Sequence, residues 1–245
     1  MKKKNYDYIS TGHYARHTKK RSNGAHLLKE GRDKSKDQSY FLAFISRHAL
    51  IRSLFPLGDL YKKEVIEAAE DMALPASKRK SSQDFCFASG GYSRHVIEKY
   101  NDIPNGGNIL DTSGEVIGKH NGIHNYTVGQ RKGLGVAASQ PLYVIKISKK
   151  RNEIVAGIKK EAHKKRLIVK QVSWLWEAGD IRNMAIRAKI RYQHRKAGAI
   201  LEKRVKGRYR LTFKDPQFAP APGQAAVFYK GDIVIGGGWI EKVIQ

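Results

Sequence analysis

The pattern of apolar and polar positions changes twice along the chain and divides it into three stretches. In the first stretch, aromatic and β-branched residues predict a short strand over residues 6–10, and residues 25–30 predict a strand that returns from a basic hairpin tip. A helix is predicted over residues 61–72, because its apolar side chains recur at helical spacing. We expect this stripe to pack into a core; it consists of Val65, Ala69 and Met72.

A cluster of proline and glycine near residue 101 begins the second stretch, where the pattern becomes mostly strands. Residues 108–111 and 115–118 predict a hairpin, because a Thr-Ser-Gly turn separates them. Residues 142–147 and 153–158 predict a second hairpin around a basic turn. The two hairpins indicate a small, mostly β domain.

The third stretch follows a basic tripeptide and contains six strand-like segments, which are typical of a small β-barrel. Residues 186–192 alternate between apolar or aromatic side chains and cations, so we expect the apolar ones inside the barrel and the cations outside. Such a row of cations is either a track for a nucleic-acid backbone or an ordinary solvated strand surface. The six segments are residues 167–175, 184–192, 199–206, 209–213, 225–229 and 233–240.

The charge of the chain adds a class of partner to this outline. The 245 residues include 47 lysines and arginines against 22 acidic residues, which gives a formal net charge of +25. Such an excess repels itself within a fold and is typical of a protein whose partner is a polyanion. The alternative is a basic surface that is merely solvated.

Composition also bears on the cellular setting. No apolar run approaches the roughly 18 residues of a spanning helix. The basic N-terminus continues into polar and aromatic residues instead of the apolar core of a signal peptide. The single cysteine excludes an internal disulfide and a cysteine-rich zinc site. We expect a soluble, cytoplasmic protein without membrane contact, and we infer no metal cofactor.

The single cysteine, Cys86, is the first candidate for chemistry. Aromatic residues flank its sulfur on both sides, and a basic cluster at residues 78–80 precedes it. A thiol among rings is typical of a small, buried core residue. A thiol close to several cations, by contrast, has a lowered pKa and is reactive. The residues around Cys86 leave both interpretations open.

Three loops are further candidates. Gly12 follows the first predicted strand, and a glycine there lets the backbone approach a ligand closely. Residues 33–39 are polar, and their side chains either face a ligand or begin a solvated helix. Residues 126–135 combine three glycines with two cations, a composition that suits phosphate binding by backbone amides. That loop does not have the spacing of a P-loop.

Eight short motifs follow one another along the chain, at residues 11–16, 36–42, 55–58, 86–87, 129–135, 191–192, 221–224 and 236–238. Each motif is weak by itself. Together, and in this order, they make the chain resemble the tRNA-specific 2-thiouridylase family (MnmA-like) over nearly its whole length.

The resemblance implies an enzyme that replaces the C2 oxygen of the wobble uridine of certain tRNAs by sulfur. ATP, accompanied by Mg²⁺, adenylates the oxygen, and a cysteine persulfide loaded by a sulfur-relay donor protein delivers the sulfur. By this resemblance Cys86 is the persulfide carrier and Gly12 lies near ATP. Seven residues match tRNA-contacting positions: His13, Lys36, Asp37, Gln38, Arg191, Tyr192 and Gln224.

The resemblance also implies a multi-domain α/β plus β fold. Residues 1–100 would be the C-terminal part of an adenine-nucleotide α-hydrolase-like (PP-loop) α/β adenylating domain. Residues 101–163 would be the central, mostly β domain, and residues 164–245 the C-terminal β-barrel that binds tRNA.

The chain departs from the family pattern at its beginning. It contains no Ser-Gly-Gly-x-Asp-Ser phosphate loop and no second cysteine. We expect the first stretch to be the second part of a parallel sheet, with apolar surface that has no partner. A truncated chain or separate N-terminal half, a miscalled start and a natural short paralogue all explain this. The rival to the enzyme is therefore a non-catalytic tRNA-binding protein derived from the family.

Overall fold

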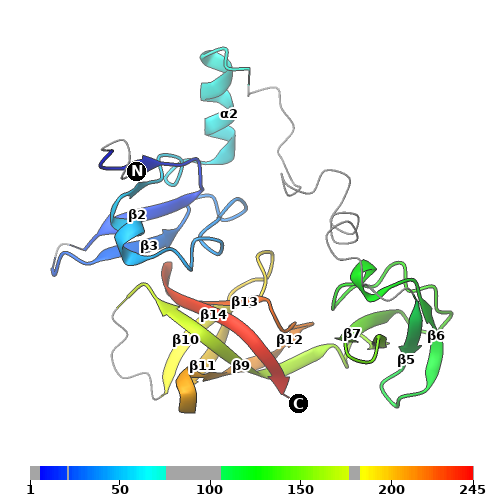
Figure 1. Ribbon diagram of the computed structural model, residues 1–245. Helices are drawn as coiled ribbons and strands as arrows, with labels where there is room; N and C mark the ends of the chain where they lie inside the picture. Colours follow the sequence, from blue (N-terminus) through cyan, green and yellow to red (C-terminus); the bar gives the residue numbers. More distant parts are fainter. Residues whose placement is uncertain (1–5, 21, 76–105, 177–182, 245) are drawn as a thin grey trace. The chain divides into compact units, whose positions relative to one another are not determined.

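The structure is a computed structural model that describes residues 6–20, 22–75, 106–176 and 183–244 (Figure 1). The chain forms two compact units, and each is described by itself. The first unit contains the described residues up to 75 together with residues 166–215 and 222–244. The second contains residues 106–165 and 216–221.

Six strands of the third stretch close into a barrel, as predicted (Figure 1). Their order is β13-β10-β11-β12-β9-β14, and β13 pairs with β14 to complete the ring. The strands are β9 (His163–Trp174), β10 (Met184–Lys189), β11 (Ala197–Lys203), β12 (Tyr209–Phe218), β13 (Ala225–Lys230) and β14 (Ile233–Ile244). A 3-10 turn, η2 (Val205–Gly207), joins β11 to β12.

The alternation along β10 is confirmed for the apolar side chains, since Ile186, Ala188 and Ile190 are all buried in the barrel core. The prediction for the cations is only partly right. Arg187 is exposed, but the Lys189 side chain is only 12% exposed because it packs against an acidic residue of the first stretch. The row of outward cations is therefore interrupted.

A hairpin from the first stretch extends the barrel sheet. It consists of β2 (Ala15–Lys19) and β3 (His26–Glu30), and β3 pairs with β14 through Leu28 opposite Val234. The sheet thereby grows to eight strands. The returning strand was predicted, but its attachment to the barrel was not. A shared core seals the junction, with Leu28 and Tyr229 among its fully buried members.

The rest of the first stretch is small and partly exposed. Two short parallel strands pair, β1 (Ile9–Ser10) and β4 (Ser53–Leu54). The helices are α1 (Arg47–Ile51) and α2 (Lys62–Asp71). A backbone hydrogen bond from Gly58 to Phe55 forms the turn between them.

Two expectations for this region need correction. The strand predicted over residues 6–10 is regular only at Ile9–Ser10. Helix α2 was predicted correctly, but its apolar stripe is not core, because no residue of α2 is buried and Met72 just beyond it is 71% exposed. Among the described residues, nothing packs over that face closely enough to bury it.

The second unit is a small four-stranded sheet in the order β6-β5-β8-β7. Both predicted hairpins are present, and the parallel pairing of β5 with β8 joins them. Its core contains Ile109, Val144 and Ile154, all fully buried. The elements are β5 (Gly107–Leu110), β6 (Val116–His120), the 3-10 turn η1 (Ile123–Asn125), β7 (Leu142–Ser148) and β8 (Glu153–Ile158).

Candidate functional site

Two groups of predicted site residues meet in the first unit. Residues 36–38 lie in the turn region between β3 and α1, where turns replace the alternative helix start. Residues 191 and 192 lie just beyond β10, after Ile190. Lys189 Nζ lies 3.6 Å from Asp37 Oδ2, and the ring centroids of Phe41 and Tyr192 are 4.5 Å apart. The fold therefore brings together two motifs that are far apart in the sequence.

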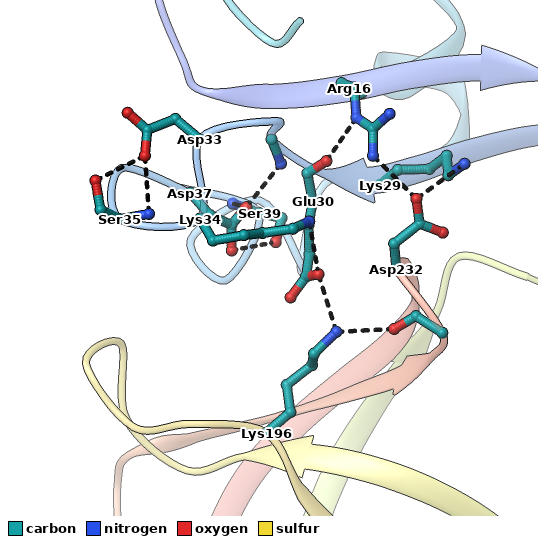
Figure 2. A network of polar contacts seen from close by, with 12 residues as sticks. Arg16, Lys29, Glu30, Asp33, Lys34, Ser35, Asp37, Ser39, Lys196 and Asp232 are labelled. Atoms are coloured by element: carbon teal, nitrogen blue, oxygen red, sulfur yellow. Dashed lines mark hydrogen bonds and ion pairs between the residues drawn. The ribbon is translucent and has the colours of Figure 1, made fainter. Parts of the chain in front are cut away.

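Asp37 is buried, and its carboxylate is bonded to other residues of the protein. Its Oδ1 accepts hydrogen bonds from the backbone N–H of Gly31 at 3.0 Å and of Ser39 at 3.1 Å. Its Oδ2 accepts from the Ser39 hydroxyl at 3.0 Å (Figure 2). The same oxygen lies 3.6 Å from Lys189 Nζ. An ionised carboxylate with several donors holds a turn firmly. Asp37 thus fixes the shape of the loop that carries its neighbours.

Gln38 ties the same loop to the start of β2. Its backbone N–H donates to the Tyr14 carbonyl at 2.9 Å, and its Oε1 accepts from the Tyr14 N–H at 3.0 Å. Lys36, by contrast, is exposed. The loop therefore presents Lys36 to solvent, and Asp37 and Gln38 hold the loop in place.

An aromatic cluster lies beside this loop. The Tyr40 hydroxyl donates to the Ala225 carbonyl at 3.0 Å, and burial raises the pKa of Tyr40 to about 12. Burial also raises the pKa of Tyr192, and the charge of Asp37 adds to that shift. Burial lowers the pKa of the half-buried Arg191 guanidinium. These residues are therefore held in a partly desolvated environment.

A pocket of about 660 Å³ opens between the loop and the end of β10. Its walls include both acidic and basic side chains, but cations predominate. Arg187 and Arg195 are exposed there, whereas Lys189 and Lys196 are mostly buried. The lining residues are Glu30, Lys34, Ser35, Asp37, Arg187, Lys189, Tyr192, Gln193, His194, Arg195 and Lys196. A pocket of this composition suits an anionic ligand that also offers hydrogen-bond donors.

Glu30 organises one wall of the pocket and was not found from the sequence. It is 4% exposed, and its Oε2 lies 2.9 Å from Lys196 Nζ and 3.0 Å from Lys34 Nζ. Lys196 also donates to the Gly231 carbonyl at 2.8 Å (Figure 2). Nearby, Asp232 pairs with Arg16. These contacts join the β2–β3 hairpin to the β10–β11 and β13–β14 connections of the barrel, and no local sequence pattern reveals them.

The pocket lining does not include Gly12, His13 or Gln224. Gly12 is exposed, and a Cβ there would only touch Leu57 at 3.6 Å, so the described structure gives no steric reason for glycine. His13 Nδ1 lies 2.9 Å from Thr11 Oγ1. Gln224 is exposed in the turn before β13. Cys86 lies outside the described residues.

The basic loop of the second unit has a defined shape. Gln130 braces it, because its Oε1 accepts from the Thr127 N–H and its Nε2 donates to the Lys132 carbonyl, both at 2.9 Å. The Gly129 N–H donates to the Val144 carbonyl at 2.7 Å. Arg131 and Lys132 are exposed at the tip. Phosphate binding by this loop stays a prediction.

A histidine pair lies on the β2–β3 hairpin. His17 Nδ1 is 3.1 Å from the Ser53 carbonyl, which can only accept, so Nδ1 carries the proton. His17 Nε2 then accepts from His26 Nδ1 at 2.8 Å. Burial lowers the pKa of His17 despite the hydrogen bond to Ser53, and His26 lowers it further. Burial and the charge of Arg191 lower the pKa of His194.

Acidification below about pH 6.5 should destabilise the protein. The folded-state pKa values of His17 and His194 lie below the unfolded value of about 6.5, so the unfolded chain binds more protons. The free energy of unfolding should therefore fall as the pH drops from about 7 to about 5.5. Urea unfolding at several pH values measures this dependence. The free energy of unfolding should change less steeply with pH in His17→Gln than in the wild type. The exposed-residue control His48→Gln should keep the full slope, and an unchanged slope in His17→Gln would contradict the assignment.

Neither a membrane-spanning helix nor a metal-binding cluster occurs in the part of the chain that the structure describes. No helix there is both long and apolar enough to cross a membrane. The same residues contain no group of three or more His, Cys, Asp or Glu side chains arranged to hold a metal ion.

Comparison with known proteins divides the chain into three matches. Residues 1–90 match the tRNA methyl transferase HUP domain, residues 94–157 the tRNA methyl transferase PRC-barrel domain, and residues 164–240 the aminomethyltransferase beta-barrel domain. The predicted fold class is thereby confirmed: a HUP-type α/β domain, a small central β domain and a C-terminal β-barrel.

Three curated relatives, each named as a tRNA-specific 2-thiouridylase MnmA, are similar along nearly the whole chain. The protein of Koribacter versatilis is 42% identical over 238 residues, which are 95% of this chain and 64% of the relative. The protein of Moorella thermoacetica is 42% identical over 98% of this chain and 67% of its own length. MnmA 2 of Syntrophus aciditrophicus is 40% identical over 97% of this chain and 75% of its own length.

The chain thus spans 64% of the length of the first of these relatives and 67% of the second. The predicted resemblance is confirmed, because the identity reaches 40% or more over nearly all of this chain. With motifs, barrel and three domain matches in agreement, the chain belongs to the tRNA-specific 2-thiouridylase (MnmA) family.

Proposed function

We propose that the protein takes part in the 2-thiolation of tRNA, in which sulfur replaces the C2 oxygen of the wobble uridine. The observation that carries the proposal is that the 36–42 and 191–192 motifs meet, with Asp37 and Tyr192 both lining one basic pocket. A polyanionic partner also agrees with the net charge of +25. As part of this proposal the protein acts in the cytoplasm, and the domains end near residues 100 and 163.

In the proposed complex the pocket and its rim hold the RNA. Exposed cations such as Lys36 and Arg195 fix the register on phosphates. Asp37 and Gln38 contribute by holding the loop, since both already use their polar atoms within the protein. We also assign tRNA contacts to Arg191, Tyr192, His13 and Gln224.

Cys86 is the proposed sulfur carrier. Its persulfide, loaded by a donor protein, attacks C2 of the activated uridine through the terminal sulfur, and the bond from C2 to the activated oxygen breaks. A second thiol must then cleave the sulfur–sulfur bond and end in a disulfide with Cys86, which frees the thiolated base. Cys86 is the only cysteine in the sequence, so that second thiol lies outside these 245 residues.

ATP is the proposed co-substrate, and with its Mg²⁺ it turns the uridine oxygen into a leaving group. The described residues around Gly12 do not form a cradle for its phosphates, since Gly12 is exposed and the sequence contains no Ser-Gly-Gly-x-Asp-Ser loop. Gly12 is therefore assigned only as a neighbour of the nucleotide.

Affinity for tRNA should fall steeply with salt, because binding releases counterions from the phosphates. Fluorescence anisotropy with an unmodified tRNA transcript at several salt concentrations should give a linear log–log plot. Arg195→Gln should reduce its slope by about one if that side chain contacts one phosphate. Lys63→Gln, on α2, is a control, because Lys63 is exposed and outside the pocket lining. Salt-independent or undetectable binding would contradict the proposed function.

A non-catalytic tRNA-binding protein is the second candidate. The observation that favours it is the sequence itself, which has one cysteine and no phosphate loop. The binder predicts the same salt dependence without sulfur transfer. The two candidates separate when thiolation is assayed in the presence of the part of a relative that this chain does not span.

A further inference from the structure

Phe41 is an apolar ring held at the surface. It is 57% exposed, although large apolar side chains usually find cover in a core. One side of the ring lies against Tyr192, with ring centroids 4.5 Å apart and planes 36° apart. Tyr192 in turn lines the basic pocket. Phe41 therefore stands at the rim of the candidate site and leaves much of its own surface open.

The support of this ring is rigid. Phe41 meets Tyr40 edge to face at 5.7 Å, and the Tyr40 hydroxyl is anchored on the Ala225 carbonyl. The Phe41 N–H donates to the Gln38 carbonyl at 3.0 Å, in the loop that Asp37 fixes. Little conformational freedom remains to be lost when a flat ligand covers the ring.

The surroundings indicate which ligand covers the ring. Exposed Arg187 and Arg195 line the adjoining pocket, and Lys36 is exposed on the same loop. An aromatic ring beside a basic groove is the arrangement with which proteins bind single-stranded nucleic acid, because bases stack and phosphates pair with cations. Cations around the ring disfavour an apolar protein partner, since burying them without partners is costly.

We propose that Phe41, backed by Tyr192, is the platform on which an unpaired base of the tRNA stacks. The inference rests on the proposed tRNA binding and adds the residue that receives the base. It also goes beyond the sequence expectation, which placed Tyr192 but not Phe41 among the tRNA-contacting residues. In the structure Phe41 and Tyr40 contact Tyr192, and Phe41 is the ring that stands open.

The test compares Phe41→Leu with Phe41→Trp in the full chain. Leucine keeps an apolar side chain but cannot stack, so affinity for unmodified tRNA should fall about tenfold at constant salt. Tryptophan offers a larger ring and should retain the affinity. An RNA stem–loop with a single abasic position in its anticodon loop identifies the stacked base. Removing that base should weaken the binding of the stem–loop strongly for the wild type and only slightly for Phe41→Leu.

Each outcome decides the inference. Equal affinity of Phe41→Leu and wild type, with salt-dependent binding intact, refutes base stacking but leaves the proposed tRNA binding untouched. An equal loss in Phe41→Leu and Phe41→Trp, together with a lower unfolding temperature, shows that Phe41 serves packing instead. If the wild type does not bind tRNA, the proposed function itself fails. Val205→Ala is the control, because Val205 is 80% exposed and outside the pocket lining.

Discussion

Cys86→Ser should abolish sulfur transfer and leave tRNA affinity unchanged. The thiolate is the only group in the sequence that can carry a persulfide, because Cys86 is its only cysteine. Serine preserves size and polarity, but its hydroxyl forms no persulfide. Two measurements follow: mass spectrometry for one added sulfur atom after treatment with a persulfide donor, and thiolation of tRNA.

The thiolation assay supplies the part of a relative that this chain does not span, so that activation of the uridine is provided. Wild type and Cys86→Ser are then compared in the same mixture. Retained thiolation in the variant would disprove the carrier role. A wild type that takes up no sulfur and supports no thiolation would favour the non-catalytic binder.

Asp37→Asn should lower the free energy of unfolding by about 3 kcal/mol, the range found when one partner of a buried ion pair is removed. The Asp37 side chain is 1% exposed, and its oxygens serve two backbone N–H groups, the Ser39 hydroxyl and Lys189. The amide cannot accept at both positions, and Lys189, only 12% exposed, loses its counter-charge. Urea unfolding followed by tryptophan fluorescence measures this, because all three tryptophans belong to the same unit.

Asp59→Asn is the matched control. The Asp59 side chain is 81% exposed and lies 3.8 Å from Arg16, so its loss should cost less than about 1 kcal/mol. If Asp37→Asn is as stable as the wild type but binds tRNA more weakly, Asp37 contacts the RNA directly. The positioning role assigned to it would then be wrong.

The regular parts of the fold could be predicted because their patterns are local. Alternation along residues 186–190 and short turns between strands are enough to indicate a barrel. That the apolar stripe of α2 stays uncovered could not be predicted in the same way. Periodicity shows which residues share a face of the helix, but not whether another element covers that face. The attachment of β3 to β14 depends on pairing between distant strands, to which no single segment gives a signal.

The candidate site was predicted through motif resemblance rather than through local chemistry. Motifs named residues 36–38 and 191–192, and of these the fold places Asp37 and Tyr192 in the lining of one pocket. They gave no reason to select Glu30, whose role arises from Lys34 and Lys196 meeting it in space. Phe41 was missed for the opposite reason, because an apolar residue in a sequence is expected to be buried.

The pairing of β3 with β14 also sets an order of assembly. The ribosome makes the β2–β3 hairpin early, but the strand that accepts it, and the Asp232 that pairs with Arg16, emerge last. Until then the core around Leu28 and Tyr40 is incomplete, since Tyr229 and Val234 have yet to be synthesised. Contacts of such large sequence separation slow folding and expose apolar surface to other chains. The nascent chain therefore needs β13 and β14 before it can complete the burial of Leu28.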